Sequence, residues 1–148
     1  MFARCFATWN LMVKPTRGIL NKNPGNMEPG GWQGEIGNDG RFATFDTMPN
    51  GIRALGKQLR VYQNRYGLDT IREAINRWAP SSENDTNGYV AFVAHVLEVD
   101  PDDKLDFNDR DTLWWLTVAI MEEENGHDAV TQYISDAEID AGIDAAIT

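Results

Sequence analysis

The feature that most constrains this chain is an almost uniformly apolar stretch, residues 113–121, which leads directly into three glutamates and Gly126. A segment that is apolar all round is expected to form a buried helix, and a glycine suits the position just after a helix C-terminus. Carboxylates at that end oppose the helix dipole. Burial disfavours the ionised form of a carboxyl, so a glutamate at the rim of the core would have a raised pKa, as a general acid requires. The alternative is a solvated acidic last turn.

Composition predicts one folded domain and limits its ligands. The chain has 148 residues, 42% of them apolar, with five Trp, which argues against disorder. A formal net charge of −10 disfavours nucleic acid and anionic membranes as partners, because both bind clustered Lys and Arg. A neutral or mixed-charge ligand such as a glycan fits better. The single Cys5 excludes an internal disulfide framework, and two distant histidines do not make a metal cluster, so no metal or other cofactor is predicted.

The first residues do not have the pattern of a targeting segment. They lack both a continuous apolar stretch and a small-residue cleavage site, which disfavours a signal peptide. No stretch of the sequence is long enough and apolar enough to span a bilayer. We interpret residues 1–16 as an N-terminal arm that packs on a single domain at residues 17–148.

The pattern of the remaining sequence predicts a mainly α (α+β) domain with a small β-hairpin. Turn-forming residues crowd positions 21–31, and two short strands at 32–36 and 41–45 flank the turn 37–40. Thr70 and Ser135 each begin a capping-box pattern, and Gly67 suits a helix end. Apolar periodicity predicts helices over roughly 50–66, 71–79, 89–97 and 112–125, with a last one after Ser135. Trp114 and Trp115 are predicted to lie in the core.

Three blocks of sequence carry a family resemblance. They are residues 17–26 (RGILNKNPGN), residues 77–86 (RWAPSSENDT) and the tripeptide Glu124-Asn125-Gly126. Together with the residues around them, these blocks resemble phage virion-associated proteins with a lysozyme-like character. The resemblance implies a virion protein with other virion proteins as partners.

A second resemblance points to chemistry. Soluble lytic transglycosylases and related glucosaminidases have a helix that ends in Glu-Ser-Gly, then a loop with a hairpin, further helices and a late Tyr-Val pair. Residues 21–45, 52–80 and 86–90 are similar to the later parts in that order. The helix bearing the glutamate is missing in front of them, and residues 118–126 resemble it at the other end of the chain. This is the order of a circularly permuted lysozyme-like domain, which is physically reasonable because domain termini often lie close together.

The second resemblance implies three catalytic candidates. Glu124 would be the catalytic acid, Glu35 a second carboxylate in the hairpin, and Tyr89 a residue that orients the substrate or the acid. Each has a plainer alternative. Glu124 could be a solvated helix end, Glu35 an exposed strand residue beside a turn, and Tyr89 an ordinary aromatic on a helix face.

Five further residues are candidates for substrate binding. Trp32 and Trp78 could stack on sugar rings, although Trp in a small domain is more often part of the core. Asn23 and Asn26 could bind N-acetyl groups, although both also suit turns. Glu83 could line the cleft, although an acid in a polar loop is usually solvated.

Two functions follow from these interpretations. The first is a phage muramidase or lytic transglycosylase that cleaves peptidoglycan glycan strands at the bacterial cell wall or periplasm. The rival is a non-catalytic virion structural or glycan-binding protein on the same scaffold, because fold alone does not imply function. An open cleft with one partly buried glutamate would favour the enzyme. We expect Glu124 to be the least exposed of the three glutamates and to face a groove shared with residues 21–45.

Overall fold

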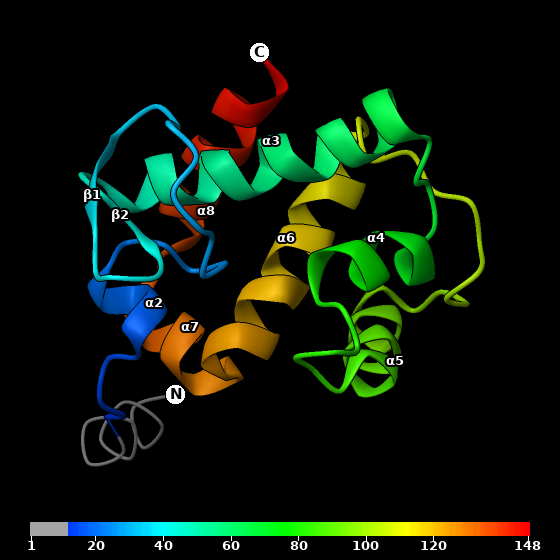
Figure 1. Ribbon diagram of the computed structural model, residues 1–148, viewed down its shortest axis with the longest axis horizontal. Coiled ribbons are helices and arrows are strands. Elements are labelled where there is room, and N and C mark those ends of the chain that lie inside the picture. Colours follow the sequence, from blue (N-terminus) through cyan, green and yellow to red (C-terminus); the bar gives the residue numbers. More distant parts are fainter. Residues whose placement is uncertain (1–11) are drawn as a thin grey trace, which may run out of the picture.

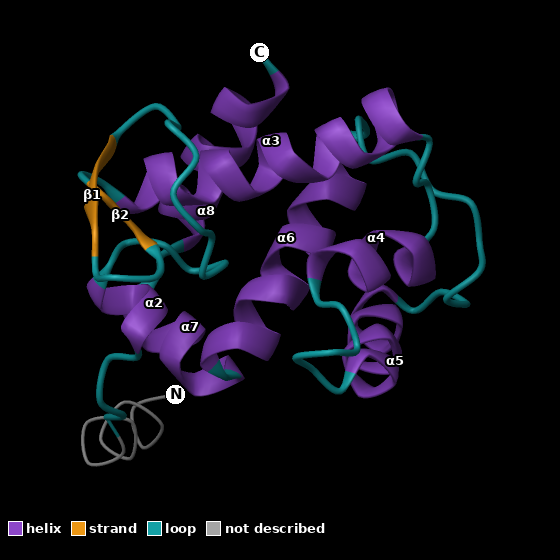
Figure 2. Cartoon of the chain, viewed as in Figure 1, coloured by secondary structure: helices purple, strands orange, loops and turns teal. Residues whose placement is uncertain are grey.

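The computed structural model describes residues 12–148, which form one mainly helical domain with a two-stranded sheet, as predicted (Figures 1 and 2). Most of the predicted N-terminal arm, residues 1–11, lies outside the described residues. Val13 donates its N–H to Gln132 at 2.8 Å and accepts a bond from the Tyr133 hydroxyl at 2.5 Å, so this segment packs on α7 (His127–Tyr133). None of the helices in residues 12–148 has the length and hydropathy that crossing a membrane requires.

Helix α6 (Arg110–Asn125) runs through the middle of the molecule (Figure 1). The Asp109 side chain caps it by accepting from the Thr112 N–H. Leu113, Leu116 and Ile120 are fully buried, and each such side chain contributes roughly 1.5–3 kcal/mol to folding. The helix contacts α2 (Arg17–Leu20), α3 (Met48–Tyr66), α5 (Thr86–Leu97), α7 and α8 (Asp136–Ile147). The predicted buried helix is therefore confirmed.

Helices α3 and α8 pack closely against each other. Helix α3 ends at Gly67, whose φ of 68° is a left-handed conformation that glycine adopts without strain. Gly142 lets α8 approach α3, because a Cβ atom there would lie 2.6 Å from the Cβ of Ile52. Both predicted helices are thus confirmed.

The two sides of the molecule differ in structure. Helices α4 (Ile71–Trp78) and α5 lie on one side of α6, and α2 lies on the other side with strands β1 (Glu35–Asn38) and β2 (Ala43–Phe45) (Figure 2). The strands are antiparallel, with Glu35 opposite Phe45 and Asn38 opposite Ala43. The hairpin is confirmed, but its first strand begins later than predicted. The short helices α2 and α7 were not predicted.

The prediction that both Trp114 and Trp115 lie in the core is wrong. Trp115 is 50% exposed, and Trp114 is half-buried with its indole N–H bonded to Asp140 at 2.9 Å. The two rings contact each other edge to face, with centroids 4.9 Å apart. The first turns of α6 thus present one apolar face to solvent, which a uniformly apolar segment cannot reveal by its periodicity.

The capping box at the start of α8 provides a test of local stability. The Ser135 hydroxyl accepts from the Glu138 N–H at 3.1 Å, and the Glu138 carboxylate accepts from the Ser135 N–H at 3.0 Å. We expect Ser135→Ala to lower the free energy of unfolding by about 1 kcal/mol and Tm by about 2–4 °C in thermal denaturation. Ser81→Ala, in an exposed loop, is the matched control, and an equal loss there would contradict the assignment.

Candidate functional site

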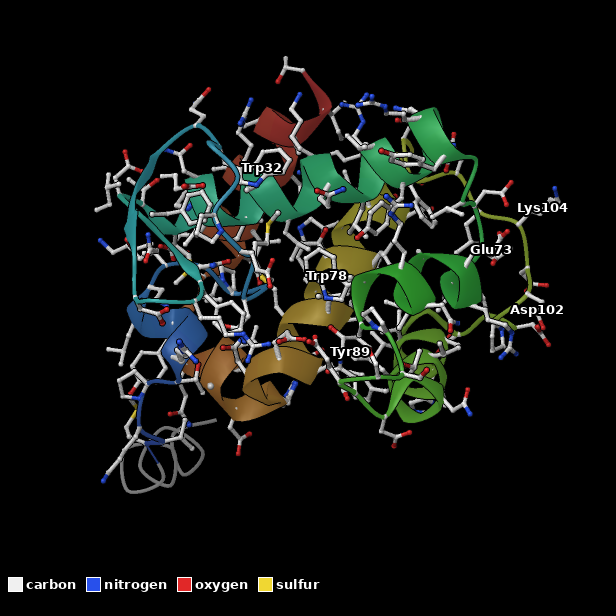
Figure 3. The ribbon with its side chains drawn as sticks, in the orientation of Figure 1. Trp32, Glu73, Trp78, Tyr89, Asp102 and Lys104 are labelled. Atoms are coloured by element: carbon white, nitrogen blue, oxygen red, sulfur yellow. The ribbon has the colours of Figure 1, made fainter. Side chains whose placement is uncertain are left out.

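The candidate site is a cavity of about 610 Å³ between the hairpin side and the α4–α5 side. The loop before the hairpin contributes residues 25–30 and Trp32, and the hairpin turn contributes Arg41 and Phe42. Helix α3 contributes Gln58 and Tyr62, and α6 contributes Glu124. The end of α4 and the loop after it contribute residues 78–80, 83 and 84. Trp32 and Trp78 lie between the two sides in Figure 3. The cavity is therefore built from segments that are distant in the sequence.

Two hydrogen bonds fix the carboxyl group of Glu124. This half-buried side chain lies in the last turn of α6. The Asn26 side-chain amide donates to its Oε1 at 2.9 Å, and the Tyr89 hydroxyl donates to its Oε2 at 2.9 Å. As expected, Glu124 shares the cavity with the segment 21–45. Each carboxyl oxygen has two lone pairs and uses one of them for these bonds. The second lone pair of either oxygen is therefore left to exchange a proton with a ligand.

The end of α6 is also fastened to the loop that provides Asn26. Asn125 accepts from the Thr16 hydroxyl at 2.5 Å and donates to the backbone carbonyl of Pro24 at 2.8 Å. It also donates to the carbonyl of Met121 within α6. Gly126 then takes a φ of 87°, which lets α7 begin immediately after α6. The Glu-Asn-Gly segment therefore holds Glu124 and the loop in a fixed relation.

Tyr89 acts as a hydrogen-bond donor to Glu124. It lies on α5 and is only 4% exposed. Burial, followed by the negative charge of Glu124, raises the pKa of the Tyr89 hydroxyl, so it stays protonated. The bond limits the orientations that the Glu124 carboxyl can take.

Exposure alone does not single out Glu124 among the three glutamates. Glu122 is also half-buried, with 12% of its side chain exposed, and it contacts the imidazole of His127. Glu123 is exposed, and partial desolvation, together with the charges of Glu124 and Asp85, raises its pKa. Glu124 is the one of the three that lines the cavity. Glu124 therefore differs from Glu122 and Glu123 by its place at the cavity, which the spacing of residues along a helix does not reveal.

Glu35 has a different role from the one that was predicted. Its Oε1 accepts from the backbone N–H groups of Gly30, Gly31 and Trp32 at 3.0, 3.1 and 3.3 Å. It is absent from the cavity lining, so the hairpin does not present this carboxylate opposite Glu124. These bonds stabilise the loop that carries Trp32. Glu35 is thus a positioning residue for the cavity wall.

The five predicted substrate-binding residues divide into two groups. Asn26, Trp32, Trp78 and Glu83 line the cavity. Asn23 does not, because it is 0% exposed and its side chain bonds to the backbone of Met27 and Ala43. Its prediction as a ligand-binding residue is therefore corrected to a structural role. Among residues 12–148, no three His, Cys, Asp or Glu side chains lie close enough together to hold a metal ion.

Sequence reasoning missed most of the cavity wall, including two residues of α3 and two at the hairpin turn. Gln58 and Tyr62 lie on α3, where their spacing is indistinguishable from that of other helix positions. Arg41 and Phe42 follow the Gly-Asn-Asp-Gly segment, which signals a turn but not a binding surface. Only the fold shows that this turn faces the end of α6.

Comparison with known proteins shows a similarity to a phage protein. No model of a known protein family matches the chain. Protein P5 of Pseudoalteromonas phage PM2 is 37% identical to it over 144 residues, which cover 88% of this chain and 88% of that protein. This identity over nearly the full length of both proteins establishes a common family. The chain belongs to the family of this phage protein.

Proposed function

We propose that this member of the phage protein P5 family cleaves the glycan strands of peptidoglycan, with Glu124 as the general acid. The observation that carries the proposal is the half-buried Glu124 carboxyl, held by Asn26 and Tyr89 inside an open cavity. A general acid must be fixed within reach of the substrate proton acceptor and be partly shielded from water. A filled cleft with solvated acids would have favoured a purely structural protein.

The arrangement suits protonation of a glycosidic oxygen. Glu124 donates its proton to that oxygen as the C1–O bond breaks, the departing sugar keeps the proton as a hydroxyl, and positive charge develops at the sugar ring. The carboxylate that remains accepts the hydrogen bonds from Asn26 and Tyr89. Because hydrogen bonds to a charged acceptor are stronger than those to a neutral one, both residues favour this proton transfer.

The position of Glu35 favours a lytic transglycosylase over a muramidase. Hydrolysis in glycosidases with two carboxylates needs the second one at a defined distance across the bond. Glu35 is bonded to its own loop, and Glu28 and Glu83 line the cavity as exposed side chains. We therefore propose that a hydroxyl of the substrate attacks C1, returns its proton to Glu124 and forms an anhydro sugar.

Aromatic side chains support a carbohydrate ligand. Trp32 and Trp78 are half-buried, so part of each ring is left accessible at the cavity. An aromatic ring of this kind offers an apolar face to a sugar ring while its polar edge remains hydrated. We propose that both residues bind the glycan strand on either side of Glu124.

The packing at the end of α6 supports the resemblance to a permuted lysozyme-like domain. Asn125 ties that end directly to the loop containing Pro24 and Asn26. In an unpermuted chain of this kind, the helix bearing the acid would continue into the same loop. We propose that the contact replaces this covalent connection, so that the same site is formed from the two ends of the chain.

Removing the Tyr89 hydroxyl should weaken catalysis without unfolding the protein. Tyr89→Phe retains the ring but loses the bond to Glu124, and a hydrogen bond to a charged group corresponds to about a 10-fold change or more. We expect kcat for glycan cleavage to fall about 10-fold with KM nearly unchanged. Tyr133→Phe, which loses a hydroxyl bond to Val13 outside the cavity, is the control. Equal kcat values for the two variants would contradict the role of Tyr89.

The phage relative supports a location in the virion. We propose that the protein is carried there with other virion proteins and acts on the bacterial cell wall or in the periplasm. The second candidate function, a non-catalytic virion structural or glycan-binding protein, would use the same location without Glu124 chemistry. Incubation with dye-labelled peptidoglycan sacculi separates the two. Release of soluble dye supports the enzyme, binding without release supports the second candidate, and absence of both overturns a role at peptidoglycan.

A further inference from the structure

Arg41 is the cationic side chain in the lining of the cavity. The other charged residues there are the carboxylates Glu28, Glu83 and Glu124. Within residues 12–148, Arg41 has no carboxylate within ion-pair distance, whereas Arg17, on the same side of the molecule, is paired. In a protein with a net charge of −10, an arginine that lines a cavity without a carboxylate partner is available to an anionic ligand.

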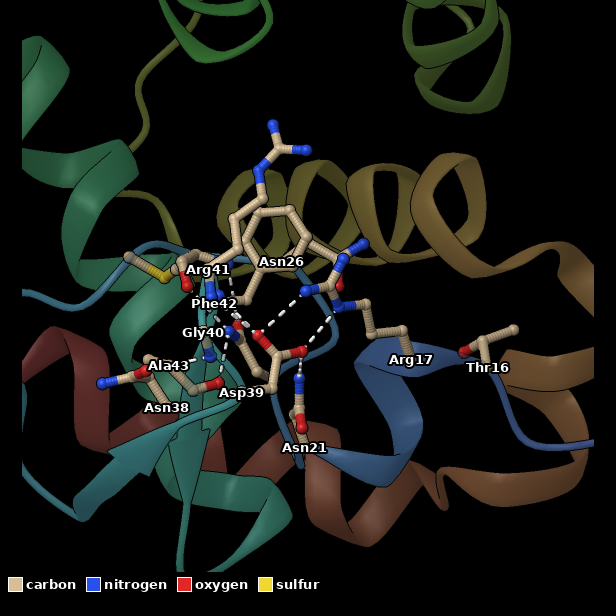
Figure 4. Close-up of polar contacts among 12 residues, drawn as sticks. Thr16, Arg17, Asn21, Asn26, Asn38, Asp39, Gly40, Arg41, Phe42 and Ala43 are labelled. Carbon is tan, nitrogen blue, oxygen red and sulfur yellow. Dashed lines mark hydrogen bonds and ion pairs between the residues drawn. The ribbon is translucent and has the colours of Figure 1, made fainter.

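The fold holds Arg41 in place from both its backbone and its side chain (Figure 4). Asp39 Oδ1 accepts the N–H groups of Arg41 and Phe42 at 3.0 and 2.8 Å. The Arg41 guanidinium lies over the Phe42 ring, 4.7 Å from its centroid, and that of Arg17 lies over the same ring at 4.6 Å. A guanidinium stacked on an aromatic ring loses freedom but keeps its N–H edge for a planar acceptor such as a carboxylate.

The Asp39 carboxylate forms an ion pair with the guanidinium of Arg17 but not with that of Arg41. It binds Arg17 through both oxygens, at 2.5 and 2.9 Å, and accepts from Asn21 as well. The bond with Arg17, followed by that with Asn21, holds the pKa of Asp39 well below its usual range, so its charge persists. The charge of Arg17 is therefore compensated by Asp39, and the Arg17 side chain packs on the Phe42 ring. The charge of Arg41 is not compensated in this way and is available to a ligand in the cavity.

We propose that Arg41 binds a carboxylate of the peptide attached to the muramic acid sugar, and so selects peptide-bearing glycan over a neutral one. The inference rests on the proposed function, because it concerns the substrate of the same cavity. Its chemistry is separate from that of Glu124, since Arg41 exchanges no proton and contacts a group outside the glycan backbone. A glycan strand without carboxylates would use the two tryptophans but gain nothing from Arg41.

The test compares one anionic ligand with two neutral ligands, and Arg41 with a second arginine, by NMR titration. The anionic ligand is a disaccharide tetrapeptide from peptidoglycan with its free amine acetylated, which has no muramyl bond left to break, and the neutral ligands are the carboxyl methyl ester of this compound and chitobiose. We expect Arg41→Gln to raise Kd for the anionic ligand about 10-fold and to leave Kd for both neutral ligands unchanged. Esterification should weaken wild-type binding about 10-fold and have little effect on the variant. Arg65→Gln, which also removes an exposed arginine stacked on a ring, should change none of these values.

The outcomes separate this inference from the function on which it rests. If the wild type binds neither the disaccharide tetrapeptide nor chitobiose, the proposed function and the role of Arg41 are both overturned. If the wild type binds both but Arg41→Gln weakens them equally or leaves them unchanged, only the role of Arg41 is overturned. Arg41→Lys, which keeps the charge but not the planar N–H edge, should retain part of the preference for the anionic ligand.

Discussion

Glu124→Gln is expected to reduce glycan cleavage on the order of 10²–10⁴-fold. The substitution keeps the size of the side chain and an oxygen that can accept from Tyr89 or Asn26, but removes the proton that the acid must transfer. The fold should remain nearly intact, because the change also relieves repulsion among like charges at the end of α6. Activity on peptidoglycan and circular dichroism measured on the same preparation would separate chemistry from folding.

Glu122→Gln is the matched control for this substitution. Glu122 lies two residues earlier, is also half-buried, and contacts His127 instead of the cavity. We expect activity close to that of the wild type and similar stability. If a folded Glu124→Gln protein cleaves glycan at the wild-type rate, Glu124 has no part in the mechanism.

Asn23→Ala should cause a large loss of stability. Because Asn23 does not line the cavity, any effect on the cavity should follow from the change in the fold. Asn23 is 0% exposed and makes three hydrogen bonds to the backbone of Met27 and Ala43, so Ala leaves buried groups without partners. We expect a loss on the order of 3 kcal/mol in the free energy of unfolding. For a domain of this size, Tm in a calorimetric scan should fall by roughly 6–12 °C.

Asn38→Ala provides the comparison for Asn23. Asn38 is exposed in β1 and accepts one bond from the Gly40 N–H within the turn. Its removal should change the free energy of unfolding by about 0.5 kcal/mol or less. Equal losses for Asn23→Ala and Asn38→Ala would show that the buried amide does not fasten the loop to the hairpin.

The elements that the sequence predicted best are those with local signals. Gly67 and Ser135 mark the end of α3 and the start of α8, and the structure has both. Helix α2 is only four residues long and lies next to Asn125, which the chain supplies from far away. Its formation depends on a contact that no local pattern encodes. The exposed Trp115 was also beyond prediction, because a segment that is apolar all round does not indicate which face meets solvent.

Several residues of the candidate site were predictable from the sequence, but their arrangement around Glu124 was not. The sequence pattern selected Glu124, Asn26 and Tyr89 separately, but it did not reveal the hydrogen bonds that join Glu124 to Asn26 and Tyr89, which lie 98 and 35 positions away. Asn23 and Asn26 occur in the same turn-rich segment, yet one side chain is directed into the protein and the other toward Glu124. Asn26 has a φ of 51°, a left-handed conformation that asparagine tolerates. The sequence alone does not indicate that Asn26 adopts it. Their different roles follow from the folded loop alone.

The most direct test of the account is mass spectrometry of the soluble products released from purified peptidoglycan. The account predicts disaccharide peptides that end in an anhydro sugar, formed by the wild type and lost in Glu124→Gln. Products that carry an added water at the same bond would retain Glu124 as the acid but contradict the proposal of a lytic transglycosylase. The absence of soluble glycan products from several peptidoglycan types, with folded protein, would contradict the central claim that this cavity cleaves glycan strands.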